Sequence, residues 1–514
     1  MSDFPWLTTL AVVPLVGSAV VAALPSGRDL LAKQVALAVS LVPMVLTIVI
    51  ALDFDKNSTA QFQFTETHQW IPQFGVSYAL GVDGIALVLI ALATVLTPVC
   101  ILASWHDVDA ERRSVRGYFA LLLLLETFMV GVFAATDVFL FYVLFEAMLV
   151  PMYFIIGSYG GQQRSYAAVK FLLYSLAGGL LMLAAVIGLY VVSDGGPQAF
   201  LFHNVVGLHM GTGTERLLFI GFFVAFAIKA PLWPVHTWLP DAAAESPPGG
   251  AVLLVGVLDK VGTFGMIRFC LPLFPDASKW ATPVVITLAV IGILYGALLA
   301  IGQTDLKRLI AYTSISHFGF IVLGIFAMTT QGQSGSTLYM VNHGFSTAAL
   351  FLIAGFLISR RGSRRIADFG GVQRVAPMLA GTFLVAGLSS LALPGLSSFV
   401  SEFLVLVGTF TRYEAAAVIA TAGIILASVY ILLMYQRTMT GEPNEHTARL
   451  PDLNVREAWV VAPLIAVIIA LGFYPKPLLD VINPAVTRTM HQVGVTDPRP
   501  HTPAPGTSAE GTSK

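Results

Sequence analysis

The chain has 514 residues, of which 56% are hydrophobic and only 11% are charged, and its formal net charge is -1. A soluble domain carries about twice this charged fraction, so the composition excludes an ordinary soluble enzyme and indicates a membrane protein. The only cysteines, Cys100 and Cys270, provide no basis for a disulfide framework, a zinc site or an iron–sulfur cluster. The charge gives no indication of a nucleic-acid partner, and we expect none.

Apolar runs long enough to cross a membrane recur along the chain. A helix needs about 20 apolar residues to span a hydrocarbon layer about 30 Å thick. Such runs fall at 4–24, 30–52, 82–104, 116–135, 137–157, 165–193, 216–245, 250–271, 281–302, 304–328, 335–359, 377–411, 413–437 and 456–475. The sequence therefore predicts an all-α polytopic membrane protein with about 14 transmembrane helices.

The connections between these runs differ in their content of Lys and Arg, which the positive-inside rule uses to assign orientation. Every other connection is basic, with Arg28, Lys33, Arg112, Arg113, Arg116, Arg164, Lys307, Arg308, Arg360, Arg361, Arg364, Arg365, Arg374, Arg437, Arg449 and Arg456. The opposing connections hold little beyond Lys56, Arg216, Lys279 and Arg412. Both termini are therefore expected outside. No basic residue precedes the first run, so we interpret it as an anchor and not as a cleaved signal peptide.

Two of the long runs are interrupted, one by Pro231 and Pro234 and the other by Pro394-Gly395. Proline removes a backbone donor, and a broken helix survives in a membrane only where protein or water satisfies the freed carbonyls. Paired breaks are typical of transporters built from inverted repeats. We therefore expect two inverted five-helix repeats, each containing a broken helix.

These features divide the chain into five parts. They are three N-terminal transmembrane helices at 1–105, a first repeat at 116–271, a second repeat at 281–438, a C-terminal helix at 456–475 and a tail at 480–514. The tail is rich in Pro, Thr, Ser and Gly, so it lacks the apolar area that would offset its ordering entropy, and the composition predicts disorder.

Four charged residues lie inside apolar runs: Glu146, Lys229, Lys260 and Glu402. A charge at the centre of a membrane helix costs roughly 2.5–3.5 kcal/mol, so a chain that keeps four of them is expected to use them. Moving Glu146 toward or away from Lys229 would control whether that lysine holds a proton. The alternative is a static ion pair that fixes helix packing. The pattern indicates an ion or proton conduit.

Lys260 has no fixed partner in the sequence, because its neighbour Asp259 projects about 100° away around the helix. It must contact water or another helix. Two histidines within apolar runs, His317 and His343, are candidate proton relays, although an intramembrane histidine also serves as a packing hydrogen-bond partner. Glu126 is a third candidate relay, with packing as its alternative.

Two further pairs of polar residues lie near the expected membrane surface. His236 and Asp241 follow the prolines of the first break and are interpreted as hydrating or capping the half-helix rather than carrying protons. Lys307 and Arg308 are interpreted first as a solvated anchor on the inner side.

Five motifs occur in order between about residues 80 and 440: FYVLFEAMLVPMYFIIG, AFAIKAPLWPVHTWLPDAAAESP, TDLKRLIAYTSISHFGFIVLGI, NHGFSTAALFL and LPGLSSFVSEF. Together they resemble the antiporter-like membrane subunits of proton-pumping NADH:quinone oxidoreductase (complex I). The resemblance implies that Glu146 and Lys229 form the charged pair of the first half-channel, that Lys260 is the central relay and that Glu402 is the terminal site. Related subunits usually place lysine at the last position, and glutamate there resembles the M-type members.

The resemblance implies a proton-translocating subunit in a bacterial cell membrane, in contact with lipids and with neighbouring subunits of the L and N types. Other subunits would oxidise NADH and reduce quinone, and this chain would bind no cofactor, since it has neither a dinucleotide-binding glycine motif nor a phosphate loop. Two alternatives remain. One is a subunit of a multisubunit sodium/proton antiporter, which Glu402 disfavours, and the other is a structural spacer that conducts nothing.

Overall fold

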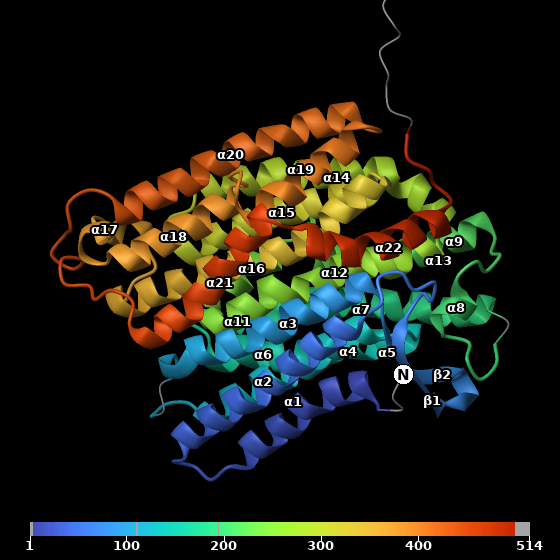
Figure 1. The fold of residues 1–514 in the computed structure, drawn as a ribbon, viewed down its shortest axis with the longest axis horizontal. Helices are drawn as coiled ribbons and strands as arrows, with labels where there is room; N and C mark the ends of the chain where they lie inside the picture. The colour runs from blue at the N-terminus through green and yellow to red at the C-terminus, as the bar shows by residue number, and fades with distance from the viewer. Residues whose placement is uncertain (1–3, 109–110, 194, 499–514) are drawn as a thin grey trace, which may run out of the picture.

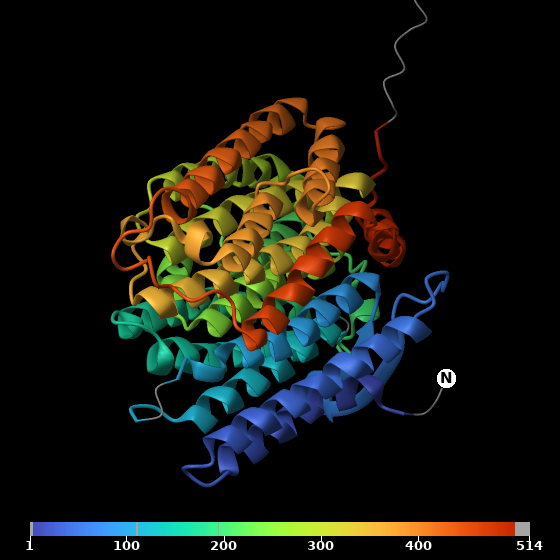
Figure 2. The same ribbon diagram turned by 60° about the vertical axis from the view of Figure 1, so that its left-hand side comes forward.

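The computed structural model describes residues 4–108, 111–193 and 195–498. Its helices run side by side along one common direction, which is horizontal in Figure 1. The end of this bundle that carries two β-strands is called the hairpin end. The opposite end, with the connection between α16 (Thr330–Arg361) and α18 (Pro377–Ser390), is called the loop end. Figures 1 and 2 both place α1 (Trp6–Ala23) and α2 (Asp29–Asp53) at one edge of the bundle and α20 (Glu414–Met439) at the opposite edge.

The N-terminal part and the first repeat up to Glu245 contain ten helices within the described residues. They are α1 Trp6–Ala23, α2 Asp29–Asp53, α3 Gly84–Ala103, α4 Val115–Ala134, α5 Val138–Ala147, α6 Leu149–Tyr159, α7 Arg164–Val192, α8 Phe202–Val205, α9 Thr212–Lys229 and α10 Trp238–Glu245. One continuous helix then spans Pro248–Leu273. It consists of α11 Pro248–Leu253, a π-helical segment Leu254–Leu258, α12 Asp259–Gly265, a second π-helical segment Met266–Cys270 and α13 Leu271–Leu273.

The second repeat and the C-terminal part follow the same pattern of long helices joined by short connections. They comprise α14 Pro275–Ile301, α15 Leu306–Phe326, α16 Thr330–Arg361, α17 Val372–Val375, α18 Pro377–Ser390, α19 Ser397–Phe410, α20 Glu414–Met439, α21 Val455–Phe473 and α22 Lys476–Val493. Among the described residues, twelve helices are long and apolar enough to cross a membrane alone. This is fewer than the fourteen expected, because α9/α10 and α18/α19 are interrupted segments of shorter helices.

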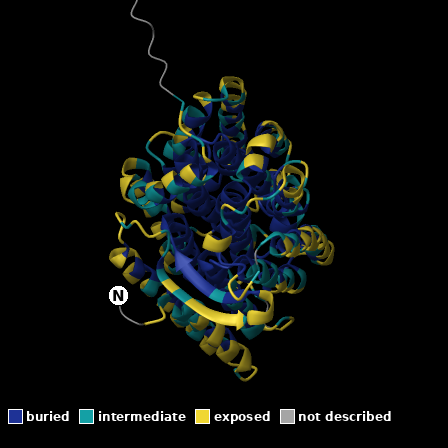
Figure 3. Cartoon of the chain, turned by 90° about the vertical axis from the view of Figure 1, so that its right-hand side faces the viewer, coloured by how far each residue is buried: buried dark blue, intermediate teal, exposed yellow. Residues whose placement is uncertain are grey.

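The predicted all-α architecture is confirmed apart from one β-hairpin. Strands β1 Gln63–Ile71 and β2 Val76–Val82 pair antiparallel, with β2 buried and β1 largely exposed (Figure 3). The backbone N–H of Leu7 at the start of α1 donates to the Glu66 carboxylate of β1 at 2.7 Å. The hairpin therefore connects the first helix to the rest of the bundle.

Asp137 fixes the hairpin to the first repeat. Its carboxylate accepts from the backbone N–H groups of Phe139 and Leu140, which caps α5, and from the N–H of Ser77 in β2. Burial raises the pKa of Asp137 to about 6, because the cost of an ionised carboxylate away from water exceeds the stabilisation from these three neutral donors.

Both predicted breaks are present, and neighbouring side chains satisfy the backbone groups that they free. In the first, the indole N–H of Trp238 donates to the Ile228 carbonyl at 2.9 Å. In the second, Gly395 has φ 92°, a conformation that glycine adopts without strain. There the Asn342 amide of α16 donates to the Ser397 carbonyl at 2.7 Å. Since α9 starts at the hairpin end and α18 at the loop end, the two broken segments run in opposite directions (Figure 1).

The prediction of disorder from residue 480 is wrong for the first part of the tail, where α22 continues to Val493. Its buried side chains recur with helical spacing at Ile482, Ala485, Val486, Met490 and Val493. Composition alone hid this amphipathic pattern. The remainder of the expected tail, from 499 to 514, lies outside the described residues.

Candidate functional site

The four charged residues expected to form the site lie in the interior of the bundle. Lys229 ends α9, Lys260 lies between the two π-helical segments, and Glu402 lies in α19. All three are buried, whereas Glu146 near the end of α5 is half-buried. The two breaks therefore place one charge each beside an interrupted helix, as the sequence predicts.

Glu146 and Lys229 approach each other without forming a hydrogen-bonded ion pair. Among the described residues, neither Oε1 of Glu146 nor Nζ of Lys229 has a hydrogen-bond partner. The Lys229 ammonium lies 5.0 Å from the ring centroid of Phe145, the residue before Glu146. The Glu146 carboxylate rests against Gly179 of α7, where an added Cβ atom would overlap it. This geometry is not that of a static pair.

Lys260 finds its partner on another helix, as the absence of a local partner requires. Its Nζ lies 2.7 Å from Nδ1 of His343 in α16 and donates to the carbonyl of Val255 at 2.5 Å. Val255 is five residues earlier, in the π-helical segment that precedes Lys260. Segments of this kind are frequent at functional sites. Lys260 and His343 are thus directly connected.

From His343 a series of polar rings leads to Glu402. The ring centroids of His343 and His317 are 5.2 Å apart, and Nε2 of His317 lies 3.4 Å from the hydroxyl of Tyr430. The ring of Tyr339 lies 5.8 Å from that of His317, and its hydroxyl donates to the Glu402 carboxylate at 3.0 Å. Imidazole and phenol groups can both donate and accept protons, so this series has the chemistry of a proton relay.

The sequence did not identify three residues of this site. Tyr339 and Tyr430 are buried between His317 and Glu402. A tyrosine in an apolar helix has a small free-energy cost, so its presence in the sequence does not indicate a functional role. Asp259 is fully buried, and neither of its carboxylate oxygens has a partner among the described residues. Its signal was the same as that of Glu146, a carboxylate in an apolar run. Glu126 is also buried without a described partner, and its role stays a prediction.

At the loop end, the half-helix α10 is held by ion pairs. Asp241 accepts from Lys170 of α7 at 2.7 Å and from Arg308 of α15 at 2.6 Å. The ring of the buried His236 lies 5.1 Å from that of Tyr295. Lys307 is buried and donates to the carbonyl of Ser246, just beyond the end of α10. A solvated anchor therefore does not describe Lys307, because the free carbonyls at a helix end attract cations inward.

Arg364, in the connection after α16, contacts both repeats. Its guanidinium pairs with Glu245 at the end of α10 at 2.8 Å and with Asp305 at the start of α15 at 2.6 Å. It also donates to the carbonyl of Ala244. One side chain from the arginine-rich loop thus joins the broken helix of the first repeat to the second repeat, beyond the topogenic role expected for this loop.

Comparisons with known proteins agree with this arrangement. The model of the family described as "NADH:quinone oxidoreductase/Mrp antiporter, TM" matches residues 135–427, which is more than half of the chain. The chain is 55% identical, over 552 aligned positions, to NADH-quinone oxidoreductase subunit M of Mycobacterium tuberculosis, covering 100% of this chain and 99% of that protein.

Solved structures give the same fold. One chain of respiratory complex I from Thermus thermophilus with bound NADH superposes with a TM-score of 0.86 at 30% identity, covering 95% of this chain and 100% of that one. A chain of the Mrp complex from Dietzia sp. has a TM-score of 0.83 at 23% identity, with 96% and 100% covered, which shows a shared fold.

Proposed function

Because the chain belongs to the family of NADH:quinone oxidoreductase M subunits, we propose that it moves protons along the series of buried groups from Glu146 and Lys229 to Glu402. The chain is a proton-translocating membrane subunit of that complex. The residues that carry the proton, their order and the sidedness of the route are the proposal.

One observation supports the proposed proton route above all. A series of polar side chains crosses the apolar interior from Lys260, which contacts His343 directly, through His317 and Tyr339 to Glu402. Each repeat has a charge beside its helix break, Lys229 in one repeat and Glu402 in the other. Intramembrane charges that face a bundle interior mark ion or proton pathways, and the groups between them here are those that exchange protons.

The unpaired geometry of Glu146 and Lys229 gives the route a control point. A carboxylate that approaches Lys229 favours its protonated form, and one that withdraws favours release. Gly179 leaves the space in which the Glu146 carboxylate rests. A shift of α5 against α7 would therefore load or discharge Lys229 without any covalent step.

The distribution of basic residues supports a sidedness for the route. The connections at the loop end contain the many Lys and Arg residues of the alternate loops, so by the positive-inside rule the loop end faces the cytoplasm of a bacterial plasma membrane. Both described ends of the chain, near Trp6 and Val493, then face outside with the hairpin. Protons would enter the first repeat from the loop end and leave the second at the hairpin end.

The chain functions with the other membrane subunits of complex I, and we expect its neighbours to be of the L and N types. We assign NADH oxidation and quinone reduction to other subunits, and we propose that this chain contains no redox centre. Each transferred charge works against about 2.3 kcal/mol per 100 mV, so the energy for pumping must reach this chain through contacts with those subunits.

The test is the variant Lys229→Ala in inverted membrane vesicles, with NADH:quinone turnover and proton uptake measured together and assembly checked on a native gel. Loss of both activities in an assembled complex is the expected result, because the route then lacks the lysine beside Glu146 that takes up the proton. Unchanged pumping would overturn the route and favour a spacer role.

The fold shared with the Mrp complex favours one second candidate, secondary cation/proton antiport. It predicts that a sodium gradient alone drives proton movement through the purified complex. The proposed route predicts proton movement that depends on NADH and quinone and is unchanged when potassium replaces sodium.

A further inference from the structure

We propose that six phenylalanines form a dry barrier that seals the first repeat toward the hairpin end. The side chains, called the phenylalanine cluster, are Phe141, Phe145, Phe222, Phe226, Phe264 and Phe269. The inference rests on the proposed function, since a barrier has a purpose only if Glu146, Lys229 and Lys260 handle protons.

The cluster residues occupy equivalent places on the three helices that bear these charges. On α5, Phe141 and Phe145 precede Glu146, and α5 starts at Asp137, beside the hairpin. On α9, which also starts at the hairpin end, Phe222 and Phe226 precede Lys229.

The helix Pro248–Leu273 runs the other way, and there Phe264 and Phe269 follow Lys260. On every helix, the phenylalanines therefore lie between the charge and the hairpin end.

The rings form one connected body. Phe141 contacts Phe145, Phe226 and Phe269 with centroid separations of 5.9, 5.9 and 4.5 Å. Phe264 lies 6.4 Å from Phe141. Phe222 joins through Phe226 at 6.1 Å and Phe269 at 6.4 Å. All six side chains are at most 1% exposed. Gly265 allows the Phe226 ring to pack closely against the helix, because an added Cβ atom at this position would overlap the ring.

Such a body cannot conduct protons. A proton wire needs groups that donate and accept hydrogen bonds, or ordered water held by polar partners, and a phenyl ring offers neither. Hydrophobic constrictions block conduction by excluding water. The cluster begins at Lys229 itself, whose ammonium lies 5.0 Å from the Phe145 ring. On each of these three helices, phenylalanine rings of the cluster thus lie between the charged group and the hairpin end.

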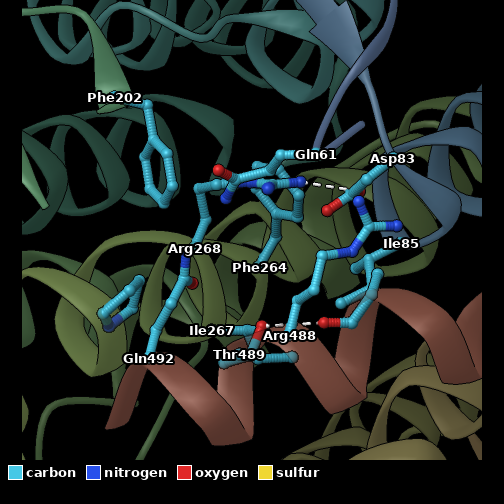
Figure 4. A pocket seen from close by; sticks show the side chains of 12 residues that line it. Gln61, Asp83, Ile85, Phe202, Phe264, Ile267, Arg268, Arg488, Thr489 and Gln492 are labelled. Atoms are coloured by element: carbon cyan, nitrogen blue, oxygen red, sulfur yellow. Dashed lines mark hydrogen bonds and ion pairs between the residues drawn. The ribbon is translucent and has the colours of Figure 1, made fainter. Parts of the chain in front are cut away.

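Beyond the cluster stands a fixed positive charge. The Arg268 guanidinium pairs with Asp83 at 2.7 Å and lies over the rings of Phe62, Phe264 and Phe202 at 4.9, 5.1 and 5.8 Å. Figure 4 shows it beside Gln61 and Asp83, at a cavity of about 10 Å³ that has room for about one water molecule. Arginine has no acceptor and stays protonated, so it cannot relay a proton.

The experiment measures passive proton leak through purified complex in proteoliposomes without NADH, driven by a potassium diffusion potential and read with an enclosed pH dye. Phe226→Ser is expected to increase the leak about tenfold, which corresponds to lowering the barrier by about 1.4 kcal/mol. Phe226→Leu keeps an apolar side chain, and its passive proton leak is expected to equal that of the unmodified complex.

The matched control is Phe219→Ser. Phe219 lies on the same helix and is equally buried, but its ring stacks on Phe223 and not on the cluster. A leak no larger in Phe226→Ser than in this control, in assembled complex, would overturn the barrier. If Phe226→Ser does not assemble, Phe269→Ser on a different helix decides the question by the same comparison.

Adding Lys229→Ala to Phe226→Ser separates the barrier from the route. The leak is expected to fall, because Lys229, whose ammonium lies against the cluster, no longer accepts the protons that pass the opened barrier. A leak as large in the double variant as in Phe226→Ser would overturn the inference, since the opened cluster would then not lead to Lys229. The route itself fails only if Lys229→Ala alone leaves NADH-driven pumping intact, so the two failures are distinguishable.

Discussion

The two repeats have opposite distributions of polar side chains between the loop end and the hairpin end. In the first repeat, polar groups such as Asp241 and Lys170 lie toward the loop end, and the phenylalanine cluster lies toward the hairpin end. In the second repeat, the α16 stretch 348–357 toward the loop end contains only apolar residues and one glycine.

Toward the hairpin end, the second repeat is polar. Gln333 and Thr337 each have a buried oxygen without a described partner, and Ser334 bonds to Asn483 of α22. A surface pocket of about 500 Å³ adjoins Ser334 and Asn483. Buried water binds polar groups that lack a protein partner, and Ser334, the residue after Gln333, lines the pocket. In the proposed route, each repeat would therefore have access to a different end, and one half-channel could not short-circuit the membrane alone.

The largest effect that would test this comparison is expected at the second break. Glu402→Gln removes the titratable group but keeps its size, so NADH-driven proton uptake is expected to fall by about a hundredfold, in the range of a lost proton-transfer group. Glu402→Asp, which retains a carboxylate, serves as the control in the same vesicle assay. Equal pumping in the glutamine variant would show that the second repeat does not use this residue.

A smaller effect is expected in the first repeat from Gly179→Ala. The added methyl group occupies the space of the Glu146 carboxylate and displaces it relative to Lys229, and we expect turnover coupled to pumping to fall about tenfold, or about 1.4 kcal/mol in barrier. Gly188→Ala is the control on the same helix, because its methyl group meets only the flexible side chain of Leu218. Similar turnover in both assembled variants would contradict a role for the position of Glu146.

Next in size is Tyr339→Phe, which removes the hydroxyl that donates to Glu402 but leaves the ring in place. The loss of one hydrogen bond of about 1 kcal/mol is expected to slow proton uptake about fivefold. Tyr430→Phe should have less effect, since its contact with His317 is longer, at 3.4 Å. If Tyr430→Phe slowed proton uptake more than Tyr339→Phe, the main relay would pass through Tyr430.

The smallest expected effect concerns the capping aspartates that begin corresponding helices of the two repeats. Asp305 of the second has the Arg364 guanidinium as partner, whereas Asp137 of the first has only neutral N–H donors. The folded-state pKa of Asp137, about 6, lies above its usual value of about 3.9. The native state therefore binds the proton more tightly, and this stabilisation is complete below pH about 4 and is lost as pH rises through about 6.

Hydrogen exchange of the Phe139 and Leu140 amides, corrected for intrinsic rates, should therefore show more protection at about pH 5 than at about pH 8. Asp137→Asn should abolish this difference. A difference that survives the substitution would assign the pH dependence to another group.

The sequence predicted the charges of the site because each is costly in an apolar helix. Glu146, Lys229, Lys260 and Glu402 stand out for this reason, and the prolines of the two breaks stand out because they interrupt long runs. Tyr339 could not be found in this way, since its cost is low and its role depends on a contact with Glu402, 63 positions later. The local composition of one helix does not predict its contacts with other helices.

Two elements of the fold were missed for a related reason. The β-hairpin is held by tertiary contacts such as that of Glu66 with the start of α1. Helix α22 buries its apolar face against α3, α13 and α16. Neither element contains a long apolar run, and both are marked in the sequence only by alternating or helical periods of apolar residues.

The two π-helical segments around Lys260 have a consequence for how the gene can change. A π-helical turn holds one residue more than an α-helical turn, so deletion of a single codon within Leu254–Leu258 would still yield an unbroken helix of adequate length. The residues after the deletion would keep their orientation, because the extra residue of the π-helical turn is the one removed, whereas a deletion in a regular α-helix rotates everything after it by about 100°. What would be lost is the wider turn whose Val255 carbonyl accepts from the Lys260 ammonium, so a deletion that leaves the membrane span intact would act on the surroundings of Lys260.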